Sequence, residues 1–395
     1  MNQTVDDPTY PSLFAGERLT LARHLAGLRK SELAARVRKS GTAVAAWESG
    51  AKRPTVTNIA ELALGLGVTP QFFAPRGTTL VPDGIVPHFR SLRSTSQKAR
   101  DQAFAYGLVA VDIASAIEKH VELPIVDVPA VPVTPEDDAN EPEEAARELR
   151  RLWGHPAGPM KHLVRLLEQH GVLVVFSHQQ TSSVDAYSFD SLGRPVVVLN
   201  PAKDDYYRQR FDAAHELGHL VMHQDAEPGS RLIEDQANRF AAEFLTPAAE
   251  VRGVLPTAMG ARAWDVLGAL KEQWGVSIQA LLYRARFLGC ISDVTYRNAM
   301  VTLSQRGWRR LEPGLVTAIE QPSMLPRSVE LLEEAHIPRA TLVDQARVPH
   351  HLFETVVSRT PRVAEDELVV ESDHSGVVSL LARTTAKETP RTSFE

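Results

Sequence analysis

The segment HELGH places two histidines and a glutamate, His215, Glu216 and His219, at a spacing that suits a metal site. On a helix, residues four apart project from the same face one turn apart, so both imidazoles can bind one ion. Glu216, beside the first histidine, would point toward the open coordination position of the ion without binding the ion itself. There it could accept a proton from the metal-bound water. The motif predicts a zinc-metallopeptidase-type site, which hydrolyses peptide bonds.

A zinc site with an open position usually has three protein ligands. The single cysteine, Cys290, excludes both a disulfide and a Cys-rich site, so the third ligand should be His, Glu or Asp. The nearby candidates are His223, Asp225, Glu227, Glu234, Asp235 and Glu243. His223 lies eight residues after His215, about two helical turns away. A single ion cannot readily bind side chains that are spread over this length of helix. The position of His223 favours a residue that orients a ligand, or a surface residue.

Glu234 is the favoured third ligand, because a loop containing Pro228 and Gly229 lets the chain return before it. Asn238, four residues later, shares the face of Glu234 and could orient it by a hydrogen bond. Glu243 is nine residues after Glu234, on the opposite side of the helix, so both cannot face the ion. We therefore interpret Glu243 as a surface charge.

The HELGH segment belongs to a predicted helix, FDAAHELGHLVMH, whose apolar residues follow helical spacing. Gly218 in its interior costs about 1 kcal/mol relative to alanine, so its presence indicates that another element passes close by. Two β-branched runs before it, VLVVF and RPVVVLN, predict strands that flank a segment containing DAYSFDSLG. Helices are expected at about 143–153 and 158–170, over EDQANRFAAEFLTP, and within 257–315.

HELGHLVMH followed by EDQANRFAAEFLTP resembles the ImmA/IrrE family of metallopeptidases. In that family a helix of the form E-x-x-A-N/D supplies the third ligand, which maps onto Glu234, Ala237 and Asn238. The resemblance continues through KEQWGVSIQALLYRARFLG and QRGWRRLEP and reaches back to the Phe89-Arg90-Ser91 segment, over roughly residues 85–320. It implies one Zn²⁺ per chain, a zincin-like α+β fold, and a partner repressor that is cleaved or otherwise inactivated.

Tyr283 and Arg284 lie within the segment that carries this resemblance. Peptide hydrolysis usually needs a group that stabilises the oxyanion formed when water attacks the carbonyl. Both residues are candidates for that role. The alternatives are core packing for Tyr283 and a salt bridge for Arg284.

Near the N-terminus, KSELAARV and SGTAVAAWES have the spacing of a helix-turn-helix, and the continuation ESGAKRPT resembles the Xre/Cro-type repressors. That family implies a second helix in the major groove of double-stranded DNA and a following basic segment on phosphate. Val44 and Trp47 would be core residues. The residues left facing DNA are Gly41, Thr42, Ala43 and Ala46.

These groove residues are small, whereas bidentate base recognition needs Arg, Lys, Asn or Gln. Phosphate binding is better supported, because residues 14–73 hold nine Lys/Arg against four Glu while the whole chain has a net charge of −6. The basic residues around the two helices are Lys30, Arg36, Arg38, Lys39, Lys52 and Arg53. The alternative is a solvated basic face on a module used for protein contact or dimerisation.

A chain of 395 residues predicts several folded units. We expect a multidomain, mainly α fold with an α+β part, a small sheet and a helical C-terminal region. The predicted segments are a helix-turn-helix domain at 14–73, a connecting helical segment at 85–123, a Pro-rich acidic linker at 124–142, a metallopeptidase domain at 143–320, a helical region at 321–364 and a poorly ordered tail at 365–395.

The leading hypothesis is a DNA-binding regulator that hydrolyses a peptide bond in a partner protein, a repressor or antitoxin-like regulator. The absence of a signal-like start and of a membrane-spanning run predicts a cytoplasmic location. We also expect that the chain could form a homodimer. A second hypothesis is a transcription factor whose metal site is structural or sensory, without proteolysis. A third has no metal and a C-terminal region for dimerisation or ligand sensing.

Overall fold

The computed structural model describes residues 14–75, 87–89, 95–133, 141–177, 185–191, 193–223, 230–309, 311–315 and 317–360. The chain divides into two compact units, 1–361 and 362–395, and every described residue belongs to the first. Several predictions lie outside the described residues: the tail at 365–395, part of the linker, and Arg90, Ser91, Asp225, Glu227, Pro228 and Gly229.

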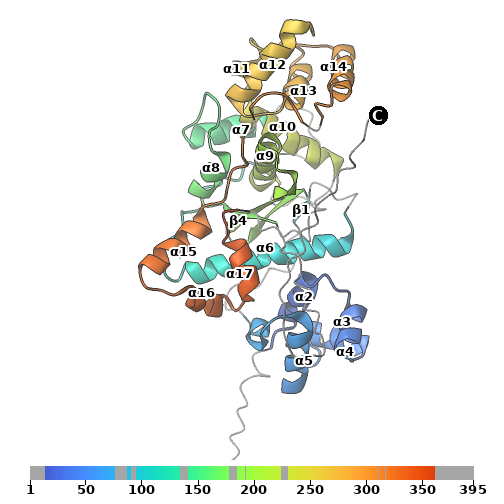
Figure 1. Ribbon diagram of the computed structural model, residues 1–395, viewed down its shortest axis with the longest axis vertical. Helices are drawn as coiled ribbons and strands as arrows, with labels where there is room; N and C mark the ends of the chain where they lie inside the picture. Colours follow the sequence, from blue (N-terminus) through green and yellow to red (C-terminus); the bar gives the residue numbers. More distant parts are fainter. Residues whose placement is uncertain are drawn as a thin grey trace, which may run out of the picture. The chain divides into compact units, whose positions relative to one another are not determined.

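The N-terminal part is a group of short helices (Figure 1). These are α2 (Gly16–Leu25), α3 (Lys30–Arg36), α4 (Gly41–Glu48), α5 (Val56–Leu66) and the 3₁₀ turn η1 (Pro70–Phe73). Ser40 begins α4, where its hydroxyl accepts a hydrogen bond from the Ala43 amide at 3.1 Å. Gly67 ends α5 with a φ of 68°, a left-handed conformation that glycine adopts without steric cost.

Helix α6 (Gln97–Ile117) packs both against the N-terminal helices and against the sheet. Towards α2, Asp112 forms a buried ion pair with Arg18, with 2.7 Å between Oδ2 and Nη1. Towards the sheet, the backbone carbonyl of Ala103 accepts a hydrogen bond from the Tyr187 hydroxyl. Gly107 allows this close packing, because a Cβ there would lie 2.7 Å from the ring of Phe189.

The sheet contains four strands in the order β1-β3-β4-β2. They are β1 (His88–Phe89), β2 (Leu173–Phe176), β3 (Ala186–Ser191) and β4 (Arg194–Leu199). Strands β2 and β4 are parallel, whereas β3 runs antiparallel to both β4 and β1. The runs VLVVF and RPVVVLN form strands as predicted. The segment between them was not predicted as a strand, yet it forms β3 beside β4.

Each face of the sheet belongs to a different core. Side chains such as Val175, Tyr187 and Phe189 pack in one core with α6 and the N-terminal helices. Side chains of alternate residues, such as Val174 and Val197, pack in a second core with the helices that follow the sheet. Strand β3 therefore contacts α6 through one face and the second core through the other.

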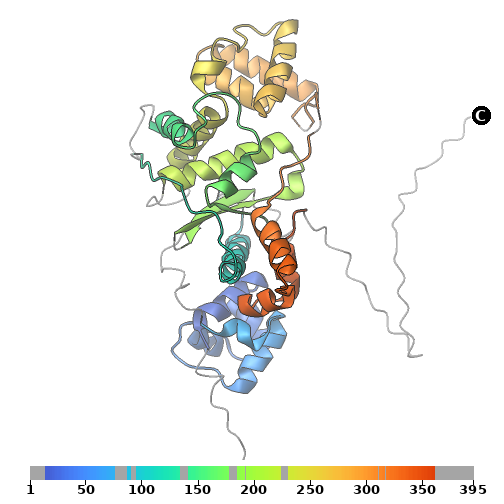
Figure 2. The ribbon, with the colours of Figure 1, turned by 90° about the vertical axis from the view of Figure 1, so that its left-hand side faces the viewer.

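The second core is built from α7 (Glu141–Leu152), α8 (Leu163–Gln169), α9 (Tyr206–Met222) and α10 (Arg231–Leu245), with the short helices η3 (Pro201–Lys203) and α11 (Ala248–Val251) between elements. Helices α12 (Ala261–Trp274), α13 (Ile278–Phe287) and α14 (Asp293–Gln305) follow. Figures 1 and 2 show α9 and α10 side by side above the sheet. The mainly helical fold with a small sheet confirms the predicted fold class.

Residues 124–133, in the first half of the predicted linker, form neither helix nor strand and pack against the second core through Val128, Val131 and Val133. The Val131 amide donates a hydrogen bond to the Val221 carbonyl of α9 at 2.8 Å. The Asp127 amide donates to the His170 carbonyl at 3.0 Å. This part of the segment is thus attached to the helices around it.

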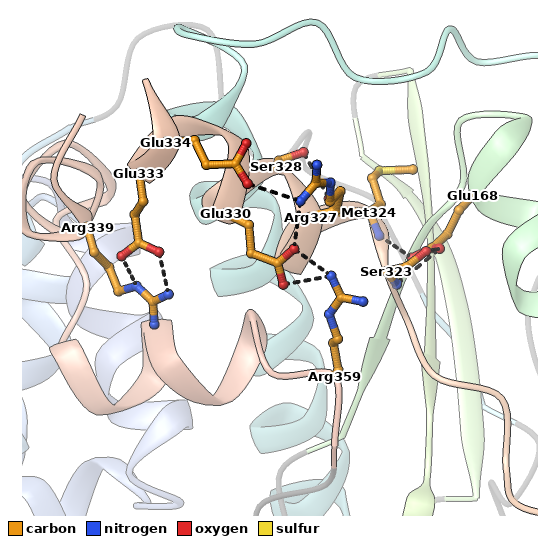
Figure 3. Close-up of polar contacts among 10 residues, drawn as sticks. All are labelled: Glu168, Ser323, Met324, Arg327, Ser328, Glu330, Glu333, Glu334, Arg339 and Arg359. Carbon is orange, nitrogen blue, oxygen red and sulfur yellow. Dashed lines mark hydrogen bonds and ion pairs between the residues drawn. The ribbon is translucent and has the colours of Figure 1, made fainter. Parts of the chain in front are cut away.

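The last described helices are α15 (Met324–Glu334), α16 (Arg339–Ala346) and α17 (His350–Val356), whose apolar side chains join the core of α6. Glu168 of α8 holds the start of α15, because its carboxylate accepts hydrogen bonds from the Ser323 hydroxyl (2.6 Å) and the Met324 amide (2.9 Å) (Figure 3). Burial raises the pKa of Glu168. Among the described residues, no helix has the length and apolar character needed to cross a membrane.

Candidate metal site

His215, His219 and Glu234 converge between α9 and α10. The Nε2 atoms of the two histidines are 3.1 Å apart. The Glu234 carboxylate oxygens lie 3.4 Å from Nε2 of His215 and 3.6 Å from Nε2 of His219. Both histidines are fully buried, whereas the Glu234 side chain is 22% exposed. Three candidate ligand atoms within 4.8 Å of one another could hold one metal ion.

Local interactions fix the two helices that carry these residues. Asp205 caps α9, where its side chain accepts hydrogen bonds from the Tyr207 and Arg208 amides at 3.0 and 3.1 Å. The two helices approach closely at Gly218, where an added Cβ would lie 3.0 Å from the ring of Phe240 in α10. The prediction that another element passes close to Gly218 is confirmed, and this element carries Glu234.

The outer nitrogen of each histidine has a hydrogen-bond partner. Nδ1 of His215 lies 3.1 Å from Oδ1 of Asn238, and Nδ1 of His219 lies 3.0 Å from Nδ1 of His223. Nε2 of His223 in turn lies 3.0 Å from Oε1 of Gln236. Asn238 was expected to orient Glu234, whereas here it contacts His215. The sequence analysis did not identify Gln236 as a partner of His223. Its position between Glu234 and Asn238 in the sequence could have indicated a role near the site.

Glu216 is completely buried, and its carboxylate interacts with strand β3. The Ser188 hydroxyl donates a hydrogen bond to Oε2 of Glu216 at 2.7 Å. Ser188 is itself fully buried. Sequence reasoning missed Ser188, because no spacing links a serine in an unpredicted strand to the HELGH helix. Strand β3 thus fixes the direction of the Glu216 carboxylate through Ser188.

Arg284 and Glu243 form a buried salt bridge. The Arg284 guanidinium also donates from Nε to the Thr246 carbonyl at 3.1 Å. Nη1 of Arg147 lies 3.2 Å from the Glu243 carboxylate on its other side. The interpretation of Glu243 as a surface charge was wrong, because its side chain is 1% exposed and pairs with the equally buried Arg284, while Arg147 reaches it from the surface. Arg284 has the salt bridge that was the alternative to an oxyanion role.

Tyr283 lines a pocket of about 470 Å³, which reaches the candidate metal site through Asn238, the partner of His215. Asn238 and Asp235 of α10 form part of the wall, and Tyr296 and Trp308 add aromatic surface. Burial raises the pKa of the Tyr283 hydroxyl, so it keeps its proton at neutral pH. A protonated phenol at this place can donate a hydrogen bond to a bound molecule.

In the N-terminal module Val44 and Trp47 are buried, as expected for core residues. On the face of α4 expected at DNA, Gly41 and Thr42 are exposed, whereas Ala43 and Ala46 are half-buried. Five of the six basic residues are exposed on the surface: Lys30, Arg36, Arg38, Lys52 and Arg53. Two of the six have acidic partners within the module: Lys39 with Glu61 at 2.7 Å, and Lys30 with Glu48 at 3.4 Å.

A His, His, Glu cluster on two adjacent helices beside a small sheet defines a metallopeptidase-like domain, here preceded by a helix-turn-helix module. Comparison with protein families gives the same division. Residues 167–286 match the family model described as IrrE N-terminal-like domain, and residues 20–73 match the model described as Helix-turn-helix. A search of curated proteins found no match. The predicted fusion of an Xre-type helix-turn-helix with an ImmA/IrrE-like domain is confirmed.

Proposed function

We propose that this protein is a DNA-binding transcriptional regulator whose IrrE-like domain is a zinc-dependent endopeptidase, and that it inactivates a partner regulator protein by cleaving it. The convergence of His215, His219 and Glu234 supports this proposal most strongly. Two imidazoles and a carboxylate form a ligand set that catalytic zinc sites use. In both histidines Nδ1 has a partner of its own, which leaves Nε2 for an ion.

A bound Zn²⁺ would act as a Lewis acid and lower the pKa of water. The protein would supply a proton acceptor through Glu216, whose carboxylate is held by the Ser188 hydroxyl and therefore has a fixed direction. Tyr283 would donate a hydrogen bond to the developing oxyanion from the wall of the neighbouring pocket. Arg284 forms a buried salt bridge with Glu243. It would therefore affect the reaction only indirectly, through the packing of α13.

The helix-turn-helix module would bring the peptidase domain to DNA. Arg38, Lys52 and Arg53 are exposed and can bind phosphate directly. Lys30 and Lys39 would exchange their internal acidic partners for phosphate. Because the exposed face of α4 is formed by small residues, binding should depend strongly on salt and weakly on base sequence.

The test combines metal analysis with a matched pair of variants. Purified wild-type protein should hold one zinc per chain, and His219→Ala should lose it. Glu216→Gln should keep the zinc and lose all cleavage of a co-expressed partner, sought among the products of neighbouring genes. Cleavage by Glu216→Gln at the wild-type rate would exclude the proposed mechanism.

The complete burial of His215, Glu216 and His219 favours a second candidate function, a structural or sensory metal site without proteolysis. A buried carboxylate is poorly placed to meet an extended peptide unless the site opens. Under this hypothesis Glu216→Gln would leave gene regulation unchanged, while loss of either histidine would unfold or deregulate the protein. The same variants therefore separate the two functions.

A further inference from the structure

The two histidines of the candidate metal site are held in different ways. An amide oxygen, Oδ1 of Asn238, contacts Nδ1 of His215 directly at 3.1 Å. His219 has no amide at this place; its Nδ1 instead meets a third imidazole, His223, at 3.0 Å. His223 comes from the end of α9, is 2% exposed, and reaches Gln236 of α10 with its other nitrogen.

The positions of the protons follow from the contacts. A neutral imidazole has one N–H donor and one acceptor nitrogen. For His219 to bind an ion through Nε2, its proton must be on Nδ1, where it faces Nδ1 of His223. His223 must then accept at Nδ1 and carry its own proton on Nε2, where it faces the amide oxygen of Gln236 at 3.0 Å. Every donor in the series thus meets an acceptor.

The same contacts exclude His223 as the third ligand. Its Nδ1 faces the side of the His219 ring that is opposite to Nε2, and its Nε2 is turned to Gln236. Neither nitrogen is directed at the point where His215, His219 and Glu234 converge. The sequence left open whether His223 orients a ligand or lies on the surface, and its burial removes the second alternative.

We propose that His223 is a positioning residue which, together with Gln236, fixes His219 in the tautomer whose Nε2 can bind zinc. The inference rests on the proposed function, because that function requires a zinc ion and His223 would act by orienting one of the zinc ligands. Helix α10 would then supply the ligand Glu234 and both orienting amides, Asn238 for His215 and Gln236 for the His223–His219 pair. A change in α10 would therefore affect all three ligands at once.

The test measures zinc affinity against a chromogenic chelator in full-length protein, with Co²⁺ absorption as a report on ligand geometry. His223→Phe keeps the ring but removes both nitrogens, and it should weaken zinc binding about 10- to 100-fold, the usual effect of losing a partner of a ligating histidine. His223→Gln should recover most of the loss, because its amide oxygen can accept from His219 and its N–H can donate to Gln236. A purely structural role would not predict this recovery.

Two further variants keep the test independent of folding. Gln236→Met has a similar volume but lacks an acceptor, so it should weaken zinc binding in the same direction as His223→Phe. His170→Phe is the matched control: this histidine also makes a ring-nitrogen contact, at 3.1 Å from Asp127, but outside the ligand set. It should leave zinc affinity unchanged.

The outcomes separate the inference from the function on which it rests. Wild-type zinc affinity and an unchanged Co²⁺ spectrum in both His223→Phe and Gln236→Met would overturn the role of His223 while leaving the zinc site in place. A wild-type protein that binds no zinc would overturn the proposed function itself, and this inference with it.

Discussion

The buried ion pair between Arg18 and Asp112 should fix the helix-turn-helix module on α6. Nη1 of Arg18 lies 2.7 Å from Oδ2 of Asp112, and the two side chains are only 9% and 5% exposed. Nε of Arg18 also donates to the Phe72 carbonyl at 3.0 Å. Asp112→Ala would leave the guanidinium buried without its counter-charge. Removing one partner of a buried pair costs about 3–5 kcal/mol.

Native-state hydrogen exchange is the suitable assay, because a chain of several units need not unfold in one step. A loss of about 3 kcal/mol corresponds to roughly a hundredfold faster exchange through opening, since about 1.4 kcal/mol is a factor of ten. We expect this acceleration in the amides of α2 and α6, with much smaller changes in α9 and α10.

Two controls define the result. The pair Arg327–Glu330 is about half exposed, so Glu330→Ala should leave exchange almost unchanged. The double variant Arg18→Met with Asp112→Leu replaces both charges by apolar groups and should recover most of the protection. If Asp112→Ala exchanged no faster than Glu330→Ala, the ion pair would not fix the module on α6.

Other predictions concern the carboxylate of Glu216, the packing of α6 and the proposed binding of DNA. Ser188→Ala removes the 2.7 Å hydrogen bond to Glu216, so we expect kcat of partner cleavage to fall about 10- to 100-fold with zinc content unchanged; a normal kcat would show that Glu216 needs no such support. Gly107→Ala places a Cβ 2.7 Å from the ring of Phe189, so thermal unfolding should reveal a loss of about 1–3 kcal/mol. Gly268→Ala, in an open part of α12, should instead stabilise the protein by up to about 1 kcal/mol, and equal effects of the two changes would contradict the packing described for α6. Lys52→Ala should weaken DNA binding about equally on all sequences and lower the slope of log affinity against log salt by about 1; loss on one sequence alone would indicate base recognition instead.

Local sequence patterns predicted the elements that depend on local interactions. The apolar spacing around HELGH predicted α9. Gly218 indicated a close neighbour because glycine is costly inside a helix unless space requires it. Phe240 is that neighbour.

Contacts between distant segments could not be predicted in this way. Strand β3 was missed because Ser188 is a polar residue at a buried position, where its partner is Glu216 of α9. Asn238 was expected to orient Glu234 on its own helix. In the structure its side-chain oxygen instead contacts Nδ1 of His215 on the neighbouring helix. Glu243 was taken for a surface charge because its partner Arg284 is 41 residues away.

The most direct measurement compares protein N-termini, by mass spectrometry, in cells that express the wild type or Glu216→Gln at equal levels and with equal zinc content. The proposed function predicts a new internal N-terminus in one regulator protein, present with the wild type and absent with Glu216→Gln. Identical sets of N-termini in the two strains, under conditions where the partner is inactivated, would contradict a peptidase and favour the structural or sensory metal site.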